Sequence, residues 1–317
     1  MNEGIPNFAR PPIGQTEEEK IAEREVLAKA RFDEQFEHPE NVILENGDTF
    51  FIYDLVPEKM TSETPIIFCP GIMGDPYNGK ETVRVLYNQG RRVLWPDAPH
   101  GIQSSVKKDI EHADMEEAEL KKSAAILKTI ELKNFDKVDI IAHSEGGINA
   151  TYSATLEPEK FRNMVLVDPA GMIGKDNLLA LGIRNAHEFV HSIQDQKKHP
   201  PEFAFGSGDG PERANLYLKE TRDETIAEAK AISRLDIRDM LVNLREKGIK
   251  ISIISGVDEK LFPMAKMQKD LTSEYVDGFY SVVGGHQNLI LEPTKWGNLT
   301  NEALKALEAK KQKEESK

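Results

Sequence analysis

The chain has 317 residues and a formal net charge of −13; 39% of its residues are hydrophobic and 30% are charged. This composition is that of a globular protein, and the length allows one large domain with a sizeable core. The acidic balance argues against nucleic-acid binding, which needs basic patches. No segment has the ~18 uninterrupted apolar residues of a membrane span.

The N-terminal residues lack the apolar segment of a secretory signal, and the one cysteine, Cys69, cannot form an internal disulfide. Both observations favour a reducing compartment. We therefore expect a cytoplasmic protein without an integral membrane segment. None of these features specifies an oligomeric state.

Residues 1–39 are predicted to form an N-terminal extension with one charged helix, which begins at a capping box of Thr16 and Glu19. Four side chains are expected on a narrow apolar face of this helix: Ile21, Val26, Leu27 and Phe32. The next segment, 41–57, contains two strand-like runs on either side of Asn46-Gly47, which is the strongest short signal for a hairpin.

Beyond the hairpin, strand-like and helix-like segments alternate along the chain. The strand-like runs are PIIFC, RRVLW, VDIIA, MVLVD, ISIIS and GFYSVV. This alternation predicts an α/β fold whose mostly parallel sheet is covered by helices on both faces. The hairpin would add an antiparallel edge to that sheet.

Residues 171–249 interrupt the alternation, because they carry helical patterns and no convincing strand. An insertion of about eighty residues is too long for a simple connection, so we interpret it as a helical cap over one end of the sheet. The α/β core then comprises residues 40–170 and 250–310. Residues 311–317 form a charged tail.

Ser144 stands where a strand-like run turns directly into a helix-like one, in the stretch Ala142-His143-Ser144-Glu145-Gly146. Ligand sites of open parallel sheets lie at the carboxyl ends of the strands. The stretch has the form G-x-S-x-G of a nucleophile elbow, with alanine at the first small position. The alternative interpretation is a serine that merely caps the helix.

This stretch resembles the nucleophile elbow of the α/β-hydrolase superfamily, and the resemblance extends over about residues 40–310. In this family the nucleophile is followed along the chain by an acid and then by a histidine. The segment SVVGGHQNLILEP, in and after the last strand-like run, resembles the family's histidine loop. The resemblance therefore implies His286 as the general base.

The resemblance implies an acid after the strand that follows the insertion, where IISGVDEKLFP offers Asp258 and Glu259. The family pattern G-x-x-D-x-x-x-P, counted from Gly256 to Pro263, places the acid at Glu259. The commoner use of aspartate favours Asp258. Asp168, at the end of another strand-like run, is a third candidate because some relatives carry the acid there.

The resemblance also implies two backbone donors for a developing oxyanion. One is the N–H of Glu145, directly after the serine, and the other is the N–H of Ile72 in the segment PGI, where relatives carry His-Gly-x. The segment WPDAPHG, residues 95–101, resembles a further loop of the family, D-x-P-G-x-G.

Two other patterns suggest different chemistry and are less convincing. The segment GDPYNGKE nearly matches the phosphate-binding pattern G-x-x-x-x-G-K-[ST], but Glu81 replaces the hydroxyl residue and Pro76 removes an N–H donor. His187 and His191 have helical spacing for a metal site, although they also fit the surface of an amphipathic helix. The resemblance implies no cofactor and no metal.

The expected function, as the resemblance implies it, is that of a serine hydrolase with carboxylesterase-like or lipase-like activity. It would cleave a carboxylic ester or related acyl compound through an acyl-enzyme intermediate, with a small acyl or ester molecule as its substrate. A thioesterase or C–C bond hydrolase of the same fold is an alternative. A ligand-binding protein of this fold that has lost turnover is another.

Overall fold

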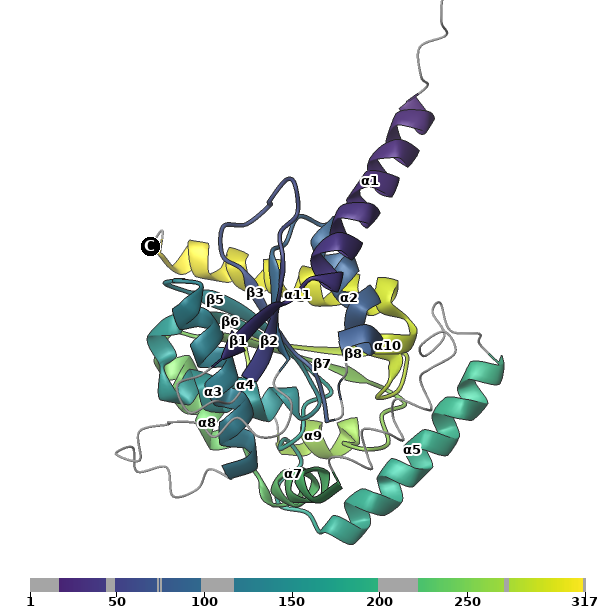
Figure 1. The fold of residues 1–317 in the computed structure, drawn as a ribbon. Helices are drawn as coiled ribbons and strands as arrows, with labels where there is room; N and C mark the ends of the chain where they lie inside the picture. The colour runs from purple at the N-terminus through teal and green to yellow at the C-terminus, as the bar shows by residue number, and fades with distance from the viewer. Residues whose placement is uncertain are drawn as a thin grey trace, which may run out of the picture.

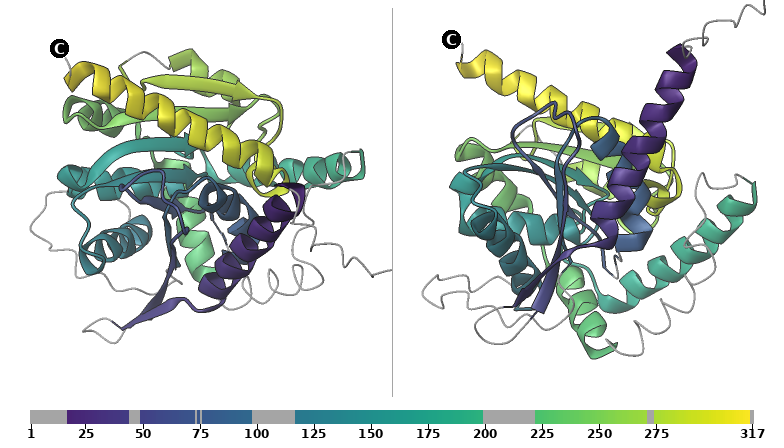
Figure 2. Two further views of the ribbon diagram at one scale, coloured as in Figure 1. Left: turned by 90° about the horizontal axis from the view of Figure 1, so that it is seen from above. Right: turned by 45° about the horizontal axis from the view of Figure 1, so that its top comes forward.

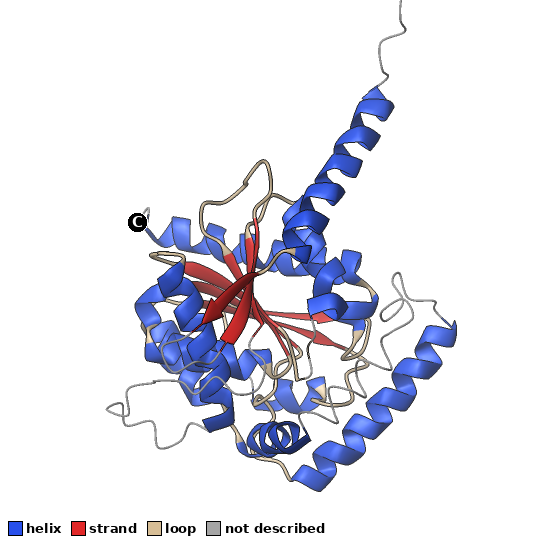
Figure 3. Ribbon diagram, in the orientation of Figure 1, coloured by secondary structure: helices blue, strands red, loops and turns tan. Residues whose placement is uncertain are grey.

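The computed structural model describes residues 17–43, 49–72, 74, 76–97, 117–198, 222–270 and 274–315. A central eight-stranded sheet in the order β1-β2-β4-β3-β5-β6-β7-β8 is surrounded by helices (Figures 1 and 3). The strands are β1 Glu40–Ile43, β2 Thr49–Leu55, β3 Ile66–Cys69, β4 Val93–Asp97, β5 Val138–His143, β6 Phe161–Val167, β7 Lys250–Gly256 and β8 Gly278–Val282.

Helices cover both faces of this sheet, and two views show α11 running across one of them (Figure 2). The helices are α1 Glu17–Glu37, α2 Pro76–Asn88, α3 Glu117–Leu132, α4 Gly146–Leu156, α5 Leu178–Lys198, α7 Arg222–Arg234, α8 Arg238–Glu246, α9 Met264–Asp270, α10 Asn288–Leu291 and α11 Pro293–Glu315. A single turn of 3₁₀ helix at Pro158–Lys160 precedes β6.

The predicted mixed sheet is confirmed. β1 pairs antiparallel with β2, with Asn41 opposite Phe51, and β2 pairs antiparallel with β4. The remaining strands from β4 to β8 pair in parallel. The Asn46-Gly47 turn of the hairpin lies outside the described residues, as does Thr16 of the predicted capping box.

The central strands are mostly apolar, in keeping with a sheet that is covered on both faces. All six residues of β5 are buried. Ile140 and Ala142 contribute to one core layer, which also receives side chains from α3, α4 and α8. Ile141 points to the opposite layer, with side chains from α1, α2 and α11. This two-sided burial explains why these strands appear as nearly continuous apolar runs rather than alternating ones.

The apolar face predicted for the first helix is only partly correct. Phe32 is fully buried, and Phe36, one turn later, is buried with it against Tyr87 and Tyr53. In contrast, Val26 and Leu27 are 67% and 62% exposed. The reason is visible in Figure 1, where only the C-terminal part of α1 packs on the body and its first turns project away. The side chain of Ile21 is not described.

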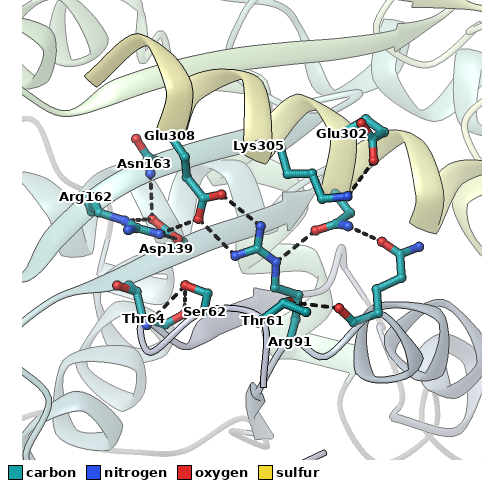
Figure 4. Close-up of polar contacts among 12 residues, drawn as sticks. Thr61, Ser62, Thr64, Arg91, Asp139, Arg162, Asn163, Glu302, Lys305 and Glu308 are labelled. Atoms are coloured by element: carbon teal, nitrogen blue, oxygen red, sulfur yellow. Dashed lines mark hydrogen bonds and ion pairs between the residues drawn. The ribbon is translucent and has the colours of Figure 1, made fainter. Parts of the chain in front are cut away.

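A network of charged side chains ties α11 to the amino ends of β5 and β6 (Figure 4). Glu308 accepts two hydrogen bonds from Arg91, each 2.9 Å long, and one of 2.7 Å from Arg162. Arg162 also donates to the fully buried Asp139, which accepts a second hydrogen bond of 2.9 Å from Asn163. Asp139 is the second residue of β5, whereas Ser144 directly follows the last residue of that strand. The network therefore holds the end of the sheet opposite Ser144.

The chain between β6 and β7 supplies α5, α7 and α8, and its described parts, 171–198 and 222–249, contain no strand. α8 packs against α4 and β7, whereas α7 packs against α3 and α5. In Figure 1, α5 and α7 lie at the lower edge of the molecule beside α9, the helix that follows β7.

Candidate active site

Ser144 occupies a sharp turn between the end of β5 at His143 and the start of α4 at Gly146. Its φ angle is +54°, in the left-handed region that non-glycine residues rarely adopt. Two backbone hydrogen bonds of 3.0 Å fix the turn: the Ser144 N–H donates to the Val167 carbonyl, and the Ser144 carbonyl accepts from Ala170. The end of β6 therefore holds the serine in its strained conformation.

The small residues around the turn are required by close backbone contacts. A Cβ added to Gly146 would lie 2.3 Å from the carbonyl oxygen of Cys69 and 2.4 Å from that of Pro70. A Cβ added to Gly71 would lie 2.9 Å from the Cβ of Ser144. The loop after β3 consequently passes directly beside the serine.

His286 lies in the loop after β8, and its imidazole reaches the serine. Its Nε2 atom is 3.0 Å from Ser144 Oγ, and both residues are buried, with 3% and 2% of their surface exposed. The pair comes from positions 142 residues apart in the chain. The geometry is that of a hydroxyl and a base within hydrogen-bond reach.

The structure brings Glu259, rather than Asp258, to the other side of the imidazole. Glu259 Oε2 lies 2.6 Å from His286 Nδ1. Its second oxygen, Oε1, accepts hydrogen bonds from the backbone N–H groups of Leu261 and Phe262, the latter at 2.8 Å. Asp258 contributes to the same loop through its backbone, whose N–H donates to the Gly284 carbonyl at 3.0 Å.

Electrostatics favour an ion pair between Glu259 and His286. Burial alone would raise the pKa of the Glu259 carboxyl, but the charge and hydrogen bond of His286, with the two backbone donors, lower it overall. Burial alone would lower the pKa of His286, but Glu259, Asp168 and Glu188 together raise it to about 9. Both shifts favour the charged forms of the pair.

Asp168, the third acid considered from the sequence, lies close to this pair without contacting the imidazole through a hydrogen bond. It follows β6, has a φ angle of +41° and is fully buried. Its Oδ1 accepts a 2.8 Å hydrogen bond from the Gly256 N–H, so it joins the ends of β6 and β7. Burial and the charge of Glu259 raise the pKa of Asp168 to about 8.

The two backbone donors expected for an oxyanion lie in the turn at Ser144 and in the loop after β3. Glu145 follows Ser144, and its carbonyl starts the α4 hydrogen-bonding pattern by accepting from Ile148 at 2.8 Å. Ile72 follows Gly71, where an added Cβ would lie 2.9 Å from the Cβ of Ser144. The Gly74 N–H and the Gly71 carbonyl, 2.9 Å apart, close the turn that contains Ile72. The later part of the predicted third loop, 98–101, lies outside the described residues.

Two side chains that no sequence pattern indicated also contact the histidine loop. His143 Nε2 lies 2.9 Å from the His286 carbonyl oxygen. Glu188, from α5, is buried and its Oε1 accepts the His286 backbone N–H at 3.2 Å. These partners are 143 and 98 residues from His286. Because these contacts join segments that are distant in the chain, no local sequence pattern indicates them.

The patterns set aside in the sequence also have positions in the structure. Gly79 and Lys80 lie inside α2, and Lys80 pairs with Asp33 of α1 at 2.8 Å. His187 is exposed on α5, while the side chain of His191 is not described. Among the described residues, one group has metal-ligand proximity: ligating atoms of Asp168, Glu259 and His286 lie within 4.8 Å of one another. In that group both imidazole nitrogens already have protein partners.

A family model described as the alpha/beta hydrolase fold matches residues 64–206. A hydrolase from Pseudomonas aeruginosa PA01 has a similar structure, with a TM-score of 0.57 and 14% identity, over 82% of this chain and 96% of that one. The chain therefore has the α/β-hydrolase fold.

Two further solved structures resemble this chain to a similar degree. A carboxylesterase of the thaumarchaeon Nitrososphaera gargenis has a TM-score of 0.57 and 16% identity, over 86% of this chain and all of that one. The enol-lactonase of Burkholderia xenovorans LB400 has a TM-score of 0.55 and 14% identity, over 84% and 100%. No curated protein matches the chain significantly. Within its described residues, no helix combines the length and apolarity needed to span a bilayer.

Proposed function

We propose that this protein is a serine hydrolase that cleaves a carboxylic ester or a related acyl compound. One observation carries the proposal: an unbroken buried series of contacts runs from Glu259 through His286 to Ser144, with distances of 2.6 and 3.0 Å. A hydroxyl alone is a weak nucleophile, and an oriented base is what activates it.

The first half of the reaction forms an acyl-enzyme. Ser144 Oγ attacks the acyl carbonyl carbon while neutral His286 accepts its proton at Nε2, and Glu259 stabilises the imidazolium. The backbone N–H groups of Ile72 and Glu145 donate to the oxyanion of the tetrahedral intermediate. The intermediate collapses when the imidazolium gives its proton to the leaving alcohol oxygen, so that Ser144 carries the acyl group.

The second half returns the enzyme to its starting state. Water enters in place of the alcohol, His286 takes its proton, and the resulting oxygen nucleophile attacks the acyl carbon. The same donors stabilise the second tetrahedral intermediate, which expels Ser144 with the proton from the imidazolium. A serine nucleophile leads to this acyl chemistry, whereas epoxide and haloalkane hydrolysis in this fold depend on a carboxylate nucleophile.

We also propose that residues 171–249 include a cap over this site. Two contacts of α5 support that role: Glu188 accepts the His286 N–H, and Arg184 Nε donates to the Leu261 carbonyl at 2.8 Å. The first helix of the insertion is thereby fixed to the loops that carry the base and the acid. Side chains of the cap would then determine which acyl groups reach Ser144.

Labelling with a fluorophosphonate probe tests the proposal, together with hydrolysis of short p-nitrophenyl esters. We expect Ser144 to be modified in the wild type, and Ser144→Ala and His286→Ala to abolish labelling and lower kcat at least about a thousandfold. Glu259→Gln and Asp258→Asn form a matched pair, of which only the first should slow labelling. A folded wild-type sample that neither reacts with the probe nor hydrolyses esters or thioesters would instead indicate a ligand-binding protein.

A further inference from the structure

A second cluster of buried charges lies next to the nucleophile turn. The carboxylate of Glu145, the residue after Ser144, is fully buried and lies 2.8 Å from the ammonium group of Lys122 on α3. The same ammonium lies 2.8 Å from the carboxylate of Glu228 on α7, whose side chain is 3% exposed. Lys122 therefore bridges the turn at the serine to a helix of the insertion.

A further acid completes this cluster. Glu119, one turn before Lys122 on α3, is fully buried. With its side-chain amide oriented to donate, Asn149 of α4 lies 2.6 Å from Glu119 Oε2. Burial, and then the negative charge of Glu145, raise the pKa of Glu119 well above its ordinary value. The ammonium of Lys122 lies within 2.8 Å of both Glu145 and Glu228.

Stability alone is a weak explanation for this arrangement. Burying several ionisable groups is costly, and a buried ion pair is often no more stabilising than packed apolar side chains. Its place in the fold is more informative, because Glu145 supplies the backbone N–H that we assign to the oxyanion. A displacement of about 1 Å at such a donor can reduce the rate of catalysis strongly.

We propose that Lys122 is a positioning residue, which holds Glu145 so that its N–H points at the oxyanion and which couples this orientation to the packing of α7. The inference rests on the proposed hydrolase function. It adds a link by which binding or opening at the insertion would change catalysis at Ser144. If the contact between Lys122 and Glu228 were lost, the ammonium would pair with Glu145 but no longer with α7.

The other insertion helix provides a parallel case. Arg184 and Glu188 of α5 contact the acid loop and the histidine loop through their side chains. With Glu228, each of the three loops that carry Ser144, Glu259 and His286 is thus joined to the insertion by a charged side chain. Of these three connections, the one made by Glu228 is indirect, because it passes through Lys122 of α3.

Three substitutions test the role of Lys122. Lys122→Met keeps most of the side-chain stem and removes the charge, and we expect kcat for a p-nitrophenyl ester to fall about ten- to a hundredfold with KM changed less than about threefold. Lys122→Arg, which preserves the charge, should recover most of that loss. Lys128→Met is the control: Lys128 is on the same helix, 36% exposed and paired with Glu131, and its loss should leave kcat unchanged.

Glu228→Gln tests the coupling to α7 in a protein that keeps the contact between Lys122 and Glu145. Hydrogen exchange of the backbone amides in α7 should become faster, and kcat should fall several-fold. Unchanged kcat in folded Lys122→Met, or equal losses in the Met and Arg variants, would overturn the positioning role. Unchanged exchange and kcat in Glu228→Gln would overturn the link to α7.

These outcomes can be separated from a failure of the proposed function. If the wild type is not labelled at Ser144, the hydrolase proposal fails, and with it the catalytic part of the inference. The exchange measurement does not depend on turnover. It still decides whether Lys122 couples residues 145–149 to α7, since Lys122→Met should then accelerate exchange in both segments together.

Discussion

The Nε2 atom of His143 lies 2.9 Å from the backbone carbonyl oxygen of His286, and the two imidazole rings are 4.8 Å apart. A carbonyl oxygen only accepts hydrogen bonds, so His143 must carry its proton on Nε2. Burial and the nearby charge of His286 lower the pKa of His143 to about 3, which keeps this ring neutral. His143 therefore supports the loop that presents His286 to Ser144.

His143→Phe keeps an aromatic ring in this position and removes the hydrogen bond to the histidine loop. We expect kcat to fall roughly tenfold, because the proposed base would be held less closely to Ser144. Steady-state ester hydrolysis measures the effect, and His38→Phe, at an exposed position, serves as the control. A folded His143→Phe protein with full kcat would show that the hydrogen bond does not position His286.

The pH dependence of activity should be set by His286. Only the neutral imidazole can accept the serine proton, so kcat/KM should rise with pH toward the pKa of about 9. Glu188→Gln removes one of the charges that raise this pKa while keeping an oxygen for the His286 N–H. The rising limb should then move to lower pH by roughly half a unit. The profile of Asp258→Asn should coincide with the wild type, and an unshifted Glu188→Gln profile would contradict this account.

Gly146→Ala tests the close approach of α4 to the loop after β3. The added methyl group would lie 2.3 Å from the Cys69 carbonyl oxygen, so the turn or the loop has to move. Overpacking of this kind lowers the free energy of unfolding by about 1–3 kcal/mol, and kcat should fall as well. Gly182→Ala in α5, where nothing lies within 4 Å of the new methyl, should instead be neutral or stabilising by up to about 1 kcal/mol. Urea unfolding of both variants makes the comparison.

The sequence predicted what depends on local pattern. Ser144 was recognisable because an apolar strand, a serine and two glycines are adjacent in the chain, and the helix after it had to start there. The choice between Asp258 and Glu259 was harder, since both lie in the same turn and only the direction and length of the side chain decide which one reaches His286. Register along the chain favoured Glu259, which is the one in contact with the imidazole.

The remaining features depend on contacts between distant segments. Lys122 and Glu228 are more than a hundred residues apart in the chain, and nothing in either helix indicates that the two form an ion pair close to Ser144. The exposed Val26 shows the same limit in another form. Helical periodicity places Val26 on the apolar face of α1, but the rest of the fold covers only the part of this helix around Phe32.

Glu308→Gln tests how much the charge network on α11 contributes to stability. Glu308 joins Arg91 and Arg162, and Arg91 is only 3% exposed, so the variant leaves a buried guanidinium without its carboxylate. The charges of the two arginines also lower the pKa of Glu308 in spite of burial, which shows that the carboxylate form is favoured in the fold. We expect the free energy of unfolding to fall by about 2–4 kcal/mol.

Glu302→Gln provides the matched control on the same helix. Glu302 pairs with Lys305 at 2.8 Å, but the two side chains are 66% and 51% exposed. Water already solvates both charges, so the substitution should change the free energy of unfolding by less than about 0.5 kcal/mol. Urea unfolding at two salt concentrations separates the cases, since screening should weaken the exposed pair and leave the buried network almost unaffected. Equal losses in the two variants would mean that burial of Arg91 does not strengthen its pairing with Glu308.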